Sequence, residues 1–278
     1  MKALAGANVG QYEQSVRALA DYNRTVELGL SACFRQHELE ELPASAPIPA
    51  DRHAAACAIG AVVIGSDQGL VGRFNDVVAD FAIKTLAALP GKAKVWAIGE
   101  RVQARLADAG ASLMGLFTLP NSVQGITPLV GRILVETEAR HREGEVTELY
   151  LFYNRPAAGA AYAPVSQRLL PLDDAWRRSL RDRKWPTKYL PEVMGIGTET
   201  LRALIREYLF ISLFRACAES LASENASRLA AMQRADKNIE EQQENLNAEF
   251  RRVRQSAIDE ELFDVISGFE ALSKGHAH

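Results

Sequence analysis

The feature that most restricts the fold of this chain is a stretch of 70 residues, 198–267, that contains neither glycine nor proline. Because these two residues most readily interrupt a helix, their absence predicts one continuous helix. At about 1.5 Å per residue it would be roughly 105 Å long. Alternating steps of four and three along it are typical of a coiled-coil seam. The members of this seam are Ala218, Ala222, Asn225, Leu229, Met232, Asp236, Ile239, Gln243, Leu246, Phe250, Val253 and Ala257.

Polar and small side chains interrupt this seam. Asn225, Asp236 and Gln243 occupy positions where a tightly closed coiled coil carries apolar residues. The seam therefore argues against a tightly zipped dimer and favours a helix whose neighbours change.

A second long helix is predicted over residues 1–42, and three prolines between residues 43 and 49 end it. Gly6, Gly10 and Gly29 each weaken it by roughly 1 kcal/mol relative to alanine, which packing against another helix would have to offset. The same three-four spacing runs through Val9, Tyr12, Val16, Leu19, Asn23, Val26, Leu30 and Cys33. If the two terminal helices pair, they must run antiparallel.

Between these helices, short apolar runs alternate with amphipathic stretches over residues 54–172. Strands are predicted at 58–64, 94–98, 116–119, 146–153 and 165–170, and helices at 74–89, 100–109 and 124–142. This alternation predicts a small, mostly parallel, Rossmann-like α/β domain, which we call the foot. Residues 173–197 are interpreted as an irregular connector, and residues 198–274 as the C-terminal helix. The predicted fold class is thus α/β plus long helices: an antiparallel coiled coil with an inserted α/β domain.

Composition excludes several function classes. The 278 residues carry a net charge of −3, which gives no support for nucleic-acid binding. The three cysteines, Cys33, Cys57 and Cys217, are scattered, so neither a zinc site nor a disulfide framework is indicated. Because no apolar run reaches about eighteen residues, we expect membrane contact only through partner proteins.

No catalytic, cofactor or metal site is predicted. The run SDQGLVG, residues 66–72, lies where a phosphate-binding loop would sit, between a strand and a helix, but it lacks both the GxGxxG spacing and the P-loop lysine. We interpret it as a tight turn in which Ser66 or Asp67 forms a local cap. None of the five histidines has a second ligand at metal-binding spacing.

Two stretches of the long helix are candidate contact surfaces. Small residues, including Ala222 and Ala226, cover nearly every side of residues 219–228, which allows a close approach by a neighbouring backbone. Packing on the partner helix is an equally good explanation of these residues. Arg251, Arg252 and Arg254 place three cations within about one turn. They form either a solvated face or a collar that meets an acidic surface.

Six sequence stretches resemble one family. ESLASENASRLAAMQRADKNIEE, residues 219–241, closely resembles the signature of the gamma subunit, the central stalk of the rotary F-type ATP synthase, and the resemblance continues through RQSAI and ISG at residues 254–258 and 266–268. SDQGLVGRFN is similar to the family's SDRGLCGGFN. LYLFYN, residues 149–154, resembles a strand of the gamma α/β domain, and the opening MKALA resembles MKMVA. The resemblance covers nearly the whole chain.

This resemblance implies a non-catalytic rotor shaft in a proton- or sodium-translocating enzyme. The implied partners are an alternating hexamer of catalytic and noncatalytic subunits, the epsilon subunit and the membrane c-ring, at the cytoplasmic face of the bacterial inner membrane. Arg254 and Gln255 match positions that meet a loop of the catalytic subunit, and Arg228 matches a position near the MKMVA segment. The predicted partner interface comprises Arg228, Arg251, Arg252, Arg254, Gln255, Ala222 and Ala226.

Two departures from the family pattern stand out. The usual N-terminal start has no counterpart before Met1, for which a late start codon, a truncation and a degenerate family member are alternative explanations. The connector is unlike the common version, a feature of divergent, second-copy ATPases. An alternative hypothesis is a stand-alone coiled-coil adaptor whose α/β domain binds a ligand. An enzyme of the doubly wound class is the third hypothesis.

The unequal helix lengths favour the shaft, because residues 239–267 would have no partner in their own chain. We expect partner subunits to cover the apolar residues there.

Overall fold

The computed structural model describes residues 2–36, 58–157, 160–189 and 197–275. They fall into two compact units, Met1–Leu229 and Ala230–His278. Helix α6 (Gly197–Gly275) begins in the first unit and supplies the described residues of the second. The predicted 70-residue helix is therefore present, and the structure extends it at both ends.

The first unit is built on a five-stranded sheet with the order β3-β2-β1-β4-β5. Strands β1 to β4 are parallel, and β5 runs antiparallel to β4 at one edge. In the central register, Val62 lies between Trp96 and Leu151. The bounds are β1 Ala58–Ile64, β2 Lys92–Ile98, β3 Leu113–Phe117, β4 Glu148–Ala157 and β5 Ala160–Leu170. The predicted mostly parallel sheet is confirmed.

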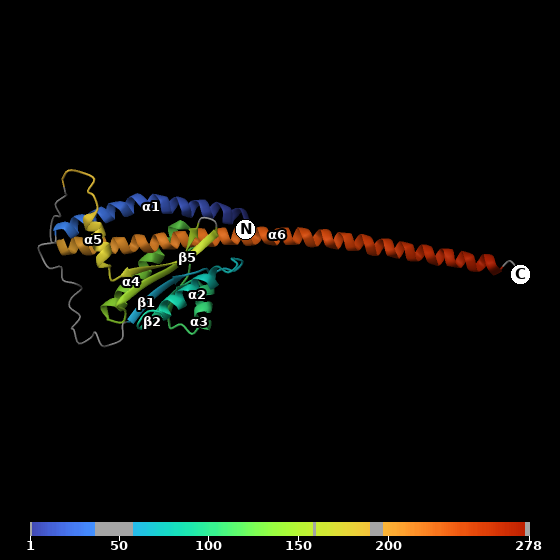
Figure 1. Cartoon of the computed structure of the whole chain (residues 1–278), viewed down its shortest axis with the longest axis horizontal. Helices are drawn as coiled ribbons and strands as arrows, with labels where there is room; N and C mark the ends of the chain where they lie inside the picture. The colour runs from blue at the N-terminus through green and yellow to red at the C-terminus, as the bar shows by residue number, and fades with distance from the viewer. Residues whose placement is uncertain (1, 37–57, 158–159, 190–196, 276–278) are drawn as a thin grey trace. The chain divides into compact units, whose positions relative to one another are not determined.

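Helices cover both faces of this sheet (Figure 1). Helices α2 (Phe74–Ala87) and α3 (Glu100–Asp108) pack on one face, where Ala61 and Val63 point. Helix α4 (Ile126–Arg142), which follows the 3₁₀ turn η3 (Val123–Gly125), and the first part of α6 pack on the other face. Because the central strands are covered on both sides, β1 reads as the continuous apolar run AIGAVVI.

Helix α1 (Lys2–Gln36) runs antiparallel to the first part of α6. The Tyr22 hydroxyl donates to the Glu207 carboxylate over 2.7 Å, and further along α1 a Cβ added at Gly29 would lie 3.2 Å from a methyl carbon of Leu204. Gly29 therefore permits a close helix approach that compensates for its low helix propensity. Residues 37–42 of the predicted helix lie outside the described residues.

The prediction of an irregular connector over residues 173–197 was wrong in its first part. Helix α5 (Asp174–Asp182) forms there, and the Asp173 carboxylate caps it by accepting from the backbone N–H of Ala175. Trp176 packs against Phe34 of α1 and Tyr208 of α6, with ring centroids 6.4 and 4.7 Å apart. Nine residues are too few to show a clear helical period in the sequence, and burial of Trp176 and Leu180 stabilises the helix.

Candidate functional site

Three polar residues, spaced four apart, bond the first part of α6 to the α/β layer. Glu219 accepts from Nε of Arg155 on β4 over 2.9 Å, and the Ser223 hydroxyl lies 3.2 Å from the backbone oxygen of Asn154. The Ser227 hydroxyl donates to the backbone oxygen of Val71 over 2.7 Å. All three are 6% exposed or less. We call Glu219, Ser223 and Ser227 the anchoring row.

The buried charge in this row is matched on both sides. One Glu219 oxygen accepts from Arg155, and the other accepts from Nε of Arg215 over 2.8 Å. Arg155 also donates to the hydroxyl of Tyr153, whose pKa is raised by burial and by the nearby Glu219 charge. Because a buried carboxylate is costly unless paired, these two guanidinium groups are what allow Glu219 to sit at the junction.

The turn after β1 is held by its own side chains. The backbone N–H of Ser66 donates to Asn75 Oδ1 over 2.9 Å, and Asn75 Nδ2 donates to the Ser66 hydroxyl over 2.8 Å. The predicted tight turn is confirmed by Gly72, which adopts a φ of 59°. Asn154 Nδ2 donates to the backbone oxygen of Phe74, which ties the end of this turn to β4. The turn is thus part of the junction with α6.

The local cap predicted for Asp67 needs correction. Its carboxylate accepts from the backbone N–H of Glu100, at the start of α3, over 3.0 Å. The other oxygen accepts from the backbone N–H of Leu119 over 2.8 Å. Asp67 therefore joins two loops that lie 33 and 52 residues away along the chain, which local spacing cannot reveal.

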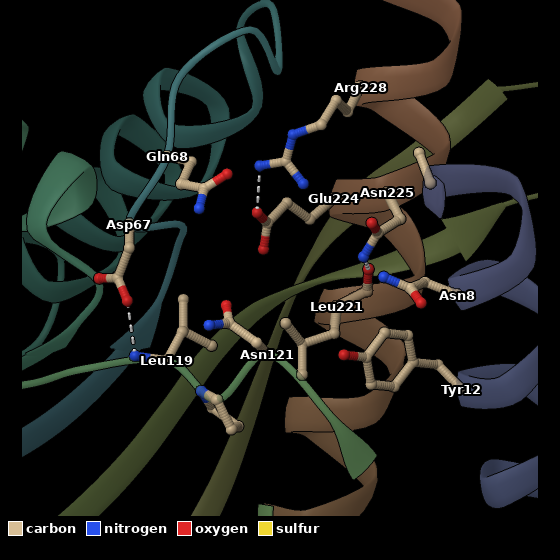
Figure 2. Close-up of a pocket in the computed structure, with 12 residues that line it drawn as sticks. Asn8, Tyr12, Asp67, Gln68, Leu119, Asn121, Leu221, Glu224, Asn225 and Arg228 are labelled. Carbon is tan, nitrogen blue, oxygen red and sulfur yellow. Dashed lines mark hydrogen bonds and ion pairs between the residues drawn. The ribbon is translucent and has the colours of Figure 1, made fainter. Parts of the chain in front are cut away.

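A polar pocket of about 290 Å³ lies beside the anchoring row (Figure 2). At its centre, Arg228 donates to Glu224 over 2.6 Å, and their side chains are only 11% and 8% exposed. Burial raises the pKa of Glu224, and Arg228 opposes this shift. The lining comes from α1, two loops and α6: Ala5, Asn8, Tyr12, Asp67, Gln68, Leu119, Pro120, Asn121, Leu221, Glu224, Asn225 and Arg228.

The structure separates the predicted interface residues into two groups. Arg228 lies in the polar pocket, while Ala222 is 2% exposed and belongs to the core shared with the sheet and α4. The small size of Ala222 is explained by this internal packing, whereas Ala226 remains partly exposed. The exposed residues of the second unit include Arg251, Arg252, Arg254 and Gln255.

The second unit exposes large apolar side chains at short intervals. Their exposed fractions run from 45% to 71%. Exposed apolar residues concentrated on one segment in this way indicate a protein contact site. The residues are Ile239, Leu246, Phe250, Val253, Ile258, Leu262, Phe263, Val265 and Ile266. We call them the exposed apolar set.

The described part of the chain supports neither a membrane-spanning helix nor a metal site. No helix there combines the length and apolar character needed to cross a bilayer. The same residues contain no cluster of three or more side chains arranged to hold a metal ion.

Together these features define a class: an α/β protein whose long C-terminal helix is bonded into the sheet layer and then presents apolar surface. The sequence profile of the family described as ATP synthase matches residues 1–272. The chain belongs to this family, as a relative of its gamma chains.

Curated gamma chains resemble it along nearly their whole length. The ATP synthase gamma chain of Anaeromyxobacter sp. strain Fw109-5 is 30% identical, over 98% of this chain and 92% of that one. That of Dechloromonas aromatica is 27% identical with the same coverage.

Solved structures show the same fold at low identity. The central stalk/c-ring structure of the Tetrahymena thermophila mitochondrial ATP synthase contains a chain that is 17% identical with a TM-score of 0.59. The match covers 85% of this chain and 97% of that one. A chain of the Euglena gracilis mitochondrial ATP synthase gives a TM-score of 0.57 at 15% identity, covering 98% and 97%.

Proposed function

We propose that this chain is the central rotor shaft of an F-type ATP synthase or ATPase. The observation that carries the proposal is the character of α6, which is bonded to the sheet by the anchoring row and then exposes an apolar set further along. A shaft needs both properties. It must be fixed to the part that is turned, and it must offer a surface to the subunits that it drives.

Within the first unit, α1 and the first part of α6 would act as an antiparallel coiled coil. Tyr12, Val26, Leu30 and Cys33 of the predicted α1 seam are each 5% exposed or less. On α6, Ala218, Ala222 and Asn225 of the predicted seam are similarly buried. Buried seams on both helices, together with their antiparallel direction, support this pairing.

The proposed partners are an alternating hexamer of catalytic and noncatalytic subunits, the epsilon subunit and the membrane c-ring. Catalysis would reside in those partners, and this chain would contribute Arg251, Arg252, Arg254, Gln255 and Ala226 to the interface. The bacterial gamma chains that it resembles support a location at the cytoplasmic face of the inner membrane. The coupling ion would be a proton or sodium.

Rotation of this chain would change nucleotide affinity by shifting the conformational equilibrium of each catalytic subunit. An equilibrium can be shifted only by contacts that differ between its states. At about 100° per residue, Ile239, Leu246, Phe250 and Val253 lie along one side of α6, whereas Arg251 and Arg252 face other sides. As the helix turned, each catalytic subunit would meet a different part of it.

Co-purification of the tagged chain from its native source tests the proposal. We expect a hexameric ATPase to be recovered with the chain, and recovery to fall at least tenfold in a Leu246→Ser, Phe250→Ser double variant. These side chains are 66% and 67% exposed in the chain alone, so the chain itself should remain folded. Val135→Ser on α4, exposed to 60%, is the matched control. Recovery of the tagged chain alone would favour the adaptor hypothesis instead.

A further inference from the structure

We draw no further inference here: the strongest candidate, the side-chain cluster in which Arg155 and Arg215 flank Glu219 where β4 meets α6, belongs to the junction already described, and its two guanidinium groups, on side chains 43% and 50% exposed, can be satisfied by solvent.

Discussion

Glu219 is the residue on which the junction between α6 and β4 depends most. Its two oxygens accept from Arg155 and Arg215, and it is 6% exposed. Glu219→Gln keeps the shape but removes the charge and at least one acceptor. Since both arginines are roughly half exposed and can be rehydrated, we expect a loss of about 1–3 kcal/mol in the free energy of unfolding.

Urea denaturation monitored by circular dichroism would measure this loss. Glu138→Gln is a suitable control, because Glu138 pairs with Arg206 at the surface. Surface pairs contribute little, so the control should change stability by less than about 1 kcal/mol. Equal stability of the Glu219 variant and the unaltered chain would show that the carboxylate is not needed at the junction.

Ala222 and Ala226 form a matched pair for testing tight packing. Ala222 is 2% exposed in the core that α6 shares with the sheet, while Ala226, one turn later, is partly exposed. Replacing Ala222 with leucine should overpack the core and cost about 1–3 kcal/mol, and Ala226→Leu should cost less. Thermal unfolding of the two variants would compare them. A lower melting temperature for Ala226→Leu than for Ala222→Leu would contradict this assignment.

At the scale of elements, the two parts of α6 should behave differently in the isolated chain. Residues of the first part are largely buried up to about Leu229, whereas residues 233–268 are all exposed. Backbone hydrogen bonds without tertiary support open readily. We therefore expect amide hydrogens of residues 201–228 to exchange much more slowly than those of residues 239–267. Mass spectrometry of exchanged peptides would measure both, and equal protection would refute the expectation.

Sequence patterns predicted the elements better than their contacts. β1 was predicted at the residues where it lies, because a strand covered on both faces must be apolar throughout. Helix α5 was missed, since its stability comes from aromatic packing with α1 and α6. The helix predicted at 124–142 began two residues too early, because Gln124 and Gly125 belong to the 3₁₀ turn that leads into α4.

The contacts of the candidate site were even harder to predict from the sequence. Glu219 lies 64 residues from Arg155, and Ser227 lies 156 residues from Val71. The spacing of four among the anchoring row is visible in the sequence, and it indicates a polar line on one helix face. The partners of these three residues could not be predicted, because they depend on how α6 packs on the sheet.

For the whole molecule, we expect no ATP hydrolysis and no measurable nucleotide affinity. The turn after β1 lacks a phosphate-binding lysine, and Asn75 already bonds the backbone N–H of Ser66. Isothermal titration of the purified chain with ATP in the presence of magnesium tests this, and a phosphate release assay covers hydrolysis. Tight ATP binding would overturn both the expectation and the non-catalytic role proposed for the chain.

The anchoring row also has a geometric consequence. Successive residues of an α-helix are turned by about 100°, so positions four apart are offset by about 40° as well as by roughly 6 Å along the axis. Glu219, Ser223 and Ser227 therefore follow a shallow spiral around α6. Three points on a spiral cannot serve as one hinge line. Any tilt of the helix about a line through two of these bonds would stretch the third. The three bonds together therefore resist tilting of α6 in every direction.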